Sequence, residues 1–82
     1  MYSVTFSDLS LKQLKRLDKA AQSRIIATIN RCRVRPHSYV KKLVDSPYYR
    51  LRVGKYRVIL NIMNNELMIF VIGIKHRKDV YK

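Results

Sequence analysis

The clearest structural signal in the chain lies in residues 48–74, which read YYRLRVGKYRVILNIMNNELMIFVIGI. Apolar and polar residues alternate through most of this stretch with a period of two, which is typical of half-buried β-strands. The stretch is interrupted by Gly54-Lys55 and by Asn64-Asn65. Both pairs suit two-residue hairpin turns because glycine and asparagine tolerate a positive φ. We therefore predict three antiparallel strands, at 48–53, 56–63 and 66–74.

The residues before this stretch predict one further strand and two helices. Apolar and polar residues alternate over residues 2–6, as in a strand. Ser7 or Asp8 can cap a first helix, and Asp18 can cap a second. Pro36 is expected to end the second helix, and the residues from there to Pro47 are expected to form a loop. The predicted buried positions are Leu9, Leu11, Leu14 and Leu17 in the first helix and Ala21, Ile25, Ile26, Ile29 and Cys32 in the second.

The predicted order of elements is β-α-α-β-β-β. An order of this kind favours an α+β fold, with a helical hairpin packed on one face of a small antiparallel sheet. The chain has no internal repeat, low-complexity tract or Gly/Ser-rich linker. We therefore expect residues 1–82 to form a single domain.

The two hairpin turns also predict which strand residues lie opposite one another. Two-residue turns place Arg52 opposite Arg57 and Arg57 opposite Ile72. The core face then carries Tyr49, Leu51, Val53, Tyr56, Val58, Leu60, Ile62, Leu67, Ile69 and Val71. The other face carries Arg50, Arg52 and Arg57 at one end and an exposed apolar strip, Met63, Met68, Phe70 and Ile72, at the other.

The charge composition points to a polyanionic or acidic partner. The chain holds 18 Lys and Arg against 5 Asp and Glu, a formal net charge of +13, whereas a small domain usually carries about 2–8. A hydrophobic content of 48% excludes a disordered basic tail. Arginines opposite one another repel, and a phosphate, which arginine binds through paired hydrogen bonds, would offset that repulsion.

The basic tail after the last strand is expected to reach the same end of the sheet as the Gly54-Lys55 turn. Arg77 could therefore join Arg50, Arg52 and Arg57 in one anion site. The simpler alternative is that these are solvated surface charges. Tyr48 and Tyr81 lie beside the basic clusters and could stack on unpaired bases, as tyrosines do in RNA recognition.

Several classes of site are not indicated. Cys32 is the only cysteine and falls in an apolar stripe, which indicates a buried, inert thiol and a reducing compartment. With His37 and His76 as the only histidines, no metal-ligand spacing is present and no cofactor is expected. The longest apolar run, residues 67–74, is too short to span a bilayer. We expect a cytoplasmic protein with no membrane segment.

Three stretches carry a resemblance to a known family: LKRLDKAAQSRI at 14–25, YYRLRVGKYRVIL at 48–60 and IGIKHRKDVYK at 72–82. With them, the chain resembles the RelE family of the RelE/ParE toxin superfamily. The resemblance implies a toxin that enters the ribosomal A site and cuts messenger RNA as a metal-independent endoribonuclease. It also implies an acidic, RelB-like antitoxin that binds the toxin in a heterodimer or heterotetramer.

The resemblance assigns roles to individual residues. Arg57 and Arg77 match the arginines that hold the scissile phosphate, and Tyr81 matches the tyrosine that orients the cleaved nucleotide. Arg50 stands where relatives often carry a lysine that acts on the nucleophile. Arginine is a poor general base, so His76, Tyr48 or a water would take the proton, or cleavage would be slower. The residues expected to bind RNA are Tyr48, Arg52, Lys55, Lys75, His76 and Lys78.

Two other functions remain open at this level. A ParE-like member of the superfamily would inhibit DNA gyrase and cut no RNA. A non-catalytic basic module would bind RNA or the ribosome surface without cleavage.

Overall fold

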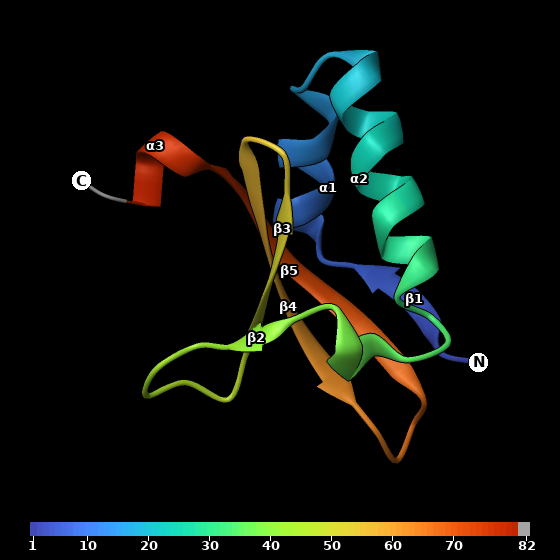
Figure 1. Ribbon diagram of the computed structural model, residues 1–82. Coiled ribbons are helices and arrows are strands. Elements are labelled where there is room, and N and C mark those ends of the chain that lie inside the picture. Colours follow the sequence, from blue (N-terminus) through green and yellow to red (C-terminus); the bar gives the residue numbers. More distant parts are fainter. Residues whose placement is uncertain (81–82) are drawn as a thin grey trace.

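A computed structural model describes residues 1–80, in which two helices lie against one face of a five-stranded sheet (Figure 1). The α+β class is confirmed, and the six predicted elements follow one another in the predicted order; in addition, a short strand precedes the first predicted hairpin and a short helix follows the last strand. The sheet order is β1-β5-β4-β3-β2. The elements are β1 (Ser3–Phe6), α1 (Asp8–Lys15), α2 (Lys19–Arg31), the 3-10 helix η1 (Pro36–Ser38), β2 (Lys41–Lys42), β3 (Tyr49–Val53), β4 (Tyr56–Met63), β5 (Met68–His76) and α3 (Arg77–Val80).

The sheet is antiparallel except at one edge. β1 runs parallel to β5, so the sheet is mixed where an antiparallel sheet was predicted. The two strands are adjacent in space but lie at opposite ends of the chain, and no local turn sets their relative direction. At the other edge, β2 and the preceding η1 occupy a segment that was predicted to be a loop. The backbone of β2 is ordered by β3, because Lys41 pairs with Arg50 and Lys42 with Tyr49.

The predicted register is confirmed in the first hairpin and wrong in the second. Arg52 lies opposite Arg57, and Gly54 has φ +56° at the first position of the turn. In the second hairpin Met63 lies opposite Met68, because the connection has four residues and Leu67 adopts φ +50°. A bulge between Ile59 and Leu60 shifts the pairing once more.

The shift moves several side chains from their predicted places. Arg57 lies opposite Lys75 instead of Ile72. Leu67, predicted to be in the core, belongs to the turn and is exposed. The core consists of Leu14, Ile25, Ile29, Cys32, Leu51, Val53, Val58, Leu60, Ile62, Ile69, Val71 and Ile74.

Both helices begin at their predicted caps. Ser7 Oγ accepts a hydrogen bond from the Ser10 N–H (3.0 Å), and Asp18 Oδ1 accepts one from the Ala21 N–H (2.7 Å). α2 ends at Arg31, before Pro36, where the hydrogen bonds change to the i→i−3 pattern. The Cys32 N–H donates to the Ile29 carbonyl, and the Arg33 N–H donates to the Asn30 carbonyl.

The buried faces of the helices are narrower than predicted. Leu9, Leu11 and Ile26 are exposed, whereas Ser10 is fully buried. α1 packs on β5 through polar side chains beyond the end of β1. Ser10 Oγ donates to the Val71 carbonyl (3.0 Å) and Ser7 Oγ to the Ile72 carbonyl (2.8 Å). Gln13 Oε1 accepts from the Ile74 N–H (2.7 Å). These side chains satisfy edge groups of β5 that lack a strand partner.

We call the sheet surface opposite the two helices the far face. The predicted apolar strip, Met63, Met68, Phe70 and Ile72, is half-buried rather than exposed. Phe70 lies between Ile69 and Val71, both of which point into the core, so its side chain projects from the far face.

No helix in the described part of the chain is long and apolar enough to cross a membrane.

Candidate nucleic-acid interface

A row of three cationic side chains crosses the far face. Arg52 of β3 lies opposite Arg57 of β4, which in turn lies opposite Lys75 of β5. Directly opposed residues of antiparallel strands share a face, and like charges in such pairs destabilise the sheet. Arg52 and Lys75 are exposed and Arg57 is half-buried. The row therefore concentrates positive charge beside the β3–β4 turn at a cost to the fold.

A second cationic pair lies farther from the turn. Lys41 of β2 lies opposite Arg50 of β3. Together with Tyr39 and Arg52, these two residues line a pocket of about 190 Å³. Sequence reasoning missed Tyr39 and Lys41, because the segment that holds them has no periodicity from which a face could be assigned.

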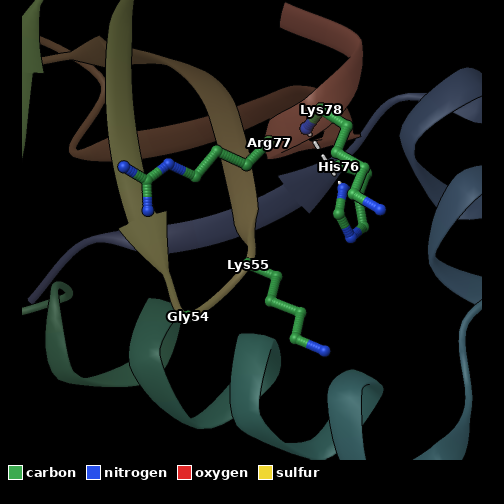
Figure 2. Close-up of a pocket in the computed structure, with 5 residues that line it drawn as sticks. All are labelled: Gly54, Lys55, His76, Arg77 and Lys78. Carbon is green, nitrogen blue, oxygen red and sulfur yellow. Dashed lines mark hydrogen bonds between the residues drawn. The ribbon is translucent and has the colours of Figure 1, made fainter.

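Arg77 reaches the β3–β4 turn, as predicted. Its backbone N–H donates to the Lys55 carbonyl (2.7 Å), which ties the start of α3 to the turn. Figure 2 shows the Arg77 side chain extending across β4 towards β3, away from His76 and Lys78. These residues, with Gly54 and Lys55, line a pocket of about 460 Å³. The turn and the end of β5 thus bring four cationic or imidazole residues to the same end of the sheet, with the Arg77 side chain turned towards β3 and away from His76 and Lys78.

His76 supports the start of α3. Its ring meets Tyr56 edge-on, with centroids 5.3 Å apart. Its Nδ1 accepts a hydrogen bond from the Lys78 N–H (3.1 Å, dashed in Figure 2). In the neutral ring the proton then resides on Nε2, and the only nitrogen lone pair is already occupied. This arrangement suits a side chain that caps a helix rather than one that accepts a proton from substrate.

One predicted site residue, Tyr48, is not gathered with the others. Tyr48 is 38% exposed and precedes β3, at the end of the strand away from the turn. Its N–H donates to Ser46 Oγ (3.1 Å). Tyr81 lies outside the described residues. Arg50, on the far face of β3, is half-buried.

The remaining candidate groups have structural surroundings. Burial raises the pKa of the Cys32 thiol, and Sγ lies 3.2 Å from the Thr28 carbonyl oxygen. Asn64 Oδ1 is bound by the Tyr2 hydroxyl (2.9 Å) and lies 3.0 Å from His37 Nε2. Among the side chains that the structure describes, no three of His, Cys, Asp or Glu gather as metal ligands.

The acidic residues of the chain lie outside the strands of the sheet. Asp8 lies in α1, Asp18 caps α2, and Asp45 and Glu66 lie in the β2–β3 and β4–β5 connections. Asp79, the fifth acidic residue, belongs to α3, which follows β5. The five described strands contain no acidic residue. The residues directly opposite Arg52, Arg57 and Lys75 in the sheet are therefore themselves cationic.

Comparison with known proteins gives a consistent result. Residues 4–81 match a family model described as the ParE toxin of the type II toxin–antitoxin system parDE. A RelE-like toxin protein of Escherichia coli is 28% identical over 85 residues, which cover 98% of this chain and 90% of that protein.

Solved structures resemble the whole fold. In an archaeal RelE–RelB complex from Pyrococcus horikoshii, the matched chain is 28% identical with a TM-score of 0.80, covering 93% of this chain and 94% of that one. A RelBE toxin–antitoxin complex of Mycobacterium tuberculosis gives a TM-score of 0.86 at 19% identity, covering 93% and 98%. The isolated RelE toxin of Escherichia coli gives 0.81 at 19% identity, covering 99% and 92%.

Proposed function

Because the chain belongs to the ParE toxin family of type II toxin–antitoxin systems, we propose that it acts in the cytoplasm as a ribosome-dependent endoribonuclease. In this proposal the toxin enters the ribosomal A site and cuts messenger RNA there, which stops translation. The similarity to a RelE-like toxin protein over nearly the whole chain supports the choice of RNA as the target.

The observation that carries the proposal is the row Arg52–Arg57–Lys75, with Arg77 tied to the adjacent turn. Three cations opposite one another destabilise a free sheet, and a bound polyanion removes that penalty. Arginine binds phosphate with two parallel hydrogen bonds, which also fixes the orientation of the phosphate. A phosphodiester backbone crossing the row would meet these donors in succession.

The reaction uses a nucleophile that RNA carries itself. The 2′-hydroxyl attacks the adjacent phosphorus, the bond to the 5′-oxygen of the next nucleotide breaks, and a 2′,3′-cyclic phosphate forms. The proton leaves the 2′-oxygen and a proton joins the departing 5′-oxygen, so the step needs no redox partner. The protein then has to align the strand and stabilise negative charge on phosphate oxygens, for which cationic donors are suited.

We assign charge stabilisation at the scissile phosphate to Arg57 and Arg77, and stacking on the cleaved nucleotide to Tyr81. Arg50 assists electrostatically, because an arginine stays protonated and does not remove a proton efficiently. The proton is taken by water in this scheme, since the Nδ1 of His76 is occupied by the Lys78 N–H. Binding or positioning of the RNA is assigned to Tyr48, Arg52, Lys55, Lys75, His76 and Lys78.

A second candidate function is favoured by the name of the matching family model. ParE-like activity would inhibit DNA gyrase, with the basic surface meeting DNA or the enzyme instead of messenger RNA. The cationic row would then serve binding only. A third candidate, a non-catalytic module that binds RNA or the ribosome, would use the same surface without cleavage.

The partner in the cell is proposed to be an acidic antitoxin that joins the toxin in a heterodimer or heterotetramer. A net charge of +13 favours rapid capture of an acidic segment. The half-buried strip of the far face offers apolar anchors next to the cationic row. An amphipathic segment that is disordered when free could fold onto both.

The test is cleavage of messenger RNA on programmed ribosomes, with 5′ ends mapped by primer extension. Cuts confined to the codon in the A site are expected, with 2′,3′-cyclic phosphate ends and no need for added metal. A DNA gyrase supercoiling assay runs in parallel. Gyrase inhibition without RNA cleavage would transfer the assignment to the ParE-like function, and protection without cutting would indicate the non-catalytic module.

A further inference from the structure

We propose that the pocket between β2 and β3 on the far face is a second nucleotide subsite. Tyr39 would stack on a base while Lys41, Arg50 and Arg52 hold the neighbouring phosphate of single-stranded RNA. The inference rests on the proposed function, because it places a further part of the same substrate. It gives Tyr39 and Lys41 a role in RNA binding.

The four side chains meet in one place. They line a pocket of about 190 Å³. Lys41 and Arg50 are directly opposed across β2 and β3, so their side chains leave the same face. Arg52 lies two residues along β3 and therefore shares that face. Tyr39 immediately follows η1 and is 50% exposed.

The charge of this pocket is not balanced by the side chains that the structure describes. In the described part of the chain, the side chains of Lys41, Arg50 and Arg52 have no hydrogen bond or ion pair. Lys41 and Arg50 oppose one another as like charges, which disfavours the β2–β3 pairing. A ligand phosphate would replace this repulsion by charge-assisted hydrogen bonds.

The aromatic wall distinguishes a nucleotide from a simple anion. Every base has a face that stacks on an aromatic ring, and proteins that bind single strands combine such rings with a cationic groove. A carboxylate of an acidic peptide would use the three cations but leave Tyr39 without a partner. The pocket is small for a whole nucleotide, so the base would lie against the exposed part of the Tyr39 ring.

The position of the pocket suits a nucleotide beside the cleaved step. Arg52 belongs both to this pocket and to the row that ends at Lys75. Arg50 lies about 7 Å from Arg52 along the strand, which is comparable with the separation of successive phosphates in an extended strand. Tyr39 and Lys41 would anchor the RNA and contribute to its affinity, whereas Arg50 would also assist the bond-breaking step.

Lys41 and Lys42 provide a matched pair for the test. Both are exposed neighbours in the two-residue strand β2 and carry the same charge. Lys42 lies opposite Tyr49, whose ring packs against the core, so the Lys42 side chain projects from the face that carries the helices. Lys41→Ala and Lys42→Ala therefore remove one charge each, on opposite faces.

The experiment measures binding of a fluorescent single-stranded 2′-O-methyl RNA, which lacks the nucleophile and is not cut. Dissociation constants are compared over a range of salt concentrations. Lys41→Ala is expected to reduce the log–log salt slope by about 0.7, the value for one phosphate contact on a single strand. Lys42→Ala should leave the slope unchanged. Tyr39→Ala should weaken binding about five- to 150-fold, and Tyr39→Phe should restore it.

Each other outcome has a distinct meaning. Equal effects of Lys41→Ala and Lys42→Ala would overturn the subsite and leave the proposed function standing. A parent protein with no salt-dependent RNA binding would overturn both. Weaker binding of polyglutamate by Lys41→Ala and Tyr39→Ala, with RNA binding unchanged, would assign the pocket to an acidic protein segment. Thermal melts check that the variants fold. If Tyr39→Ala does not fold, the comparison of Lys41→Ala with Lys42→Ala decides, because both of these lysines are exposed.

Discussion

At the scale of single residues, Arg77 shows how backbone contacts place a functional side chain. Its N–H donates to the Lys55 carbonyl, and the N–H of the next residue, Lys78, donates to His76 Nδ1. The side chain itself is exposed and contributes little to packing. Removal of the guanidinium should therefore affect chemistry without disturbing the fold.

Arg77→Ala is expected to lower the rate of RNA cleavage about 10²–10³-fold, the usual loss for one donor that stabilises transition-state charge. The measurement is single-turnover cleavage on programmed ribosomes, together with growth arrest on induction. Arg16→Ala is the matched control, because Arg16 is exposed and follows α1, outside the cationic row. Full activity in Arg77→Ala, or a large fall in its melting temperature, would contradict the assigned role.

His76 is predicted to act through Arg77 by capping α3. His76→Asn keeps an acceptor, Oδ1, near the position of Nδ1 and should retain most of the cleavage activity. His76→Gln places its acceptor one bond farther out and should lower the rate of RNA cleavage about two- to thirtyfold, the range expected for a lost cap.

The pair His76→Asn and His76→Gln also separates positioning from proton transfer. A general base could not be replaced by an amide, so inactivity of both variants would assign proton transfer to His76. The pH–rate profile provides a second readout, since His76→Asn should leave its shape unchanged if the ring only positions the backbone.

At the scale of elements, the β3–β4 hairpin fixes both the cationic row and the attachment of α3. Gly54 adopts φ +56° at the turn, a conformation that residues with a Cβ disfavour. A Cβ at this position would lie 3.1 Å from Arg24 Nη1, the flexible end of a side chain from α2. The backbone conformation therefore costs more than the contact.

Gly54→Ala is expected to destabilise the protein by about 1–2 kcal/mol, which lowers the melting temperature by about 4–8 °C for each kcal/mol. Gly73→Ala is the control. Its Cβ would lie 3.5 Å from Gln13 Oε1, an ordinary contact, and its φ is not positive. That change should be neutral or slightly stabilising. Equal melting temperatures for the two variants would show that the turn does not depend on glycine.

At the scale of the whole molecule, the two sides of the sheet have different tasks. The helices cover one face and bury the core, while the far face carries cations at one end and a half-buried apolar strip at the other. The positive charge exceeds what a fold of this size needs for solubility. Binding of RNA and of an acidic antitoxin should both depend on it.

RNA binding by the parent protein is expected to be strongly dependent on salt. About four phosphate contacts on a single strand give a log–log slope near −3, from about −0.7 for each contact. Fluorescence anisotropy with the uncleavable RNA measures the slope directly. A flat response would mean that the net charge does not engage the phosphate backbone.

The apolar strip is expected to anchor the antitoxin. Phe70→Asp should weaken antitoxin binding by at least tenfold in isothermal titration, because a charge placed in a desolvated contact is costly. Leu9→Asp is the control, since Leu9 is exposed on α1 and lies away from the far face. Weaker binding by Leu9→Asp with unchanged binding by Phe70→Asp would place the antitoxin on the helices.

The sequence by itself determined the elements whose signals are local. The caps Ser7 and Asp18 and the Gly54-Lys55 turn were predictable, because each depends on hydrogen bonds or backbone angles within a few residues. The opposition of Arg52 and Arg57 followed from that turn. The end of the sheet reached by Arg77 followed from the alternating direction of the strands.

Only the tertiary structure decided the contacts between distant segments. The four-residue connection with Leu67 and the bulge near Ile59 placed Lys75, not Ile72, opposite Arg57. Whether a turn holds two or four residues depends on packing of the whole strand, not on the turn residues alone. The pairing of Lys41 with Arg50 joins β3 to a segment without periodicity, and β1 pairs in parallel with β5, from the other end of the chain. Such pairings are selected by burial and by satisfaction of backbone hydrogen bonds across the fold, and a local pattern does not encode them.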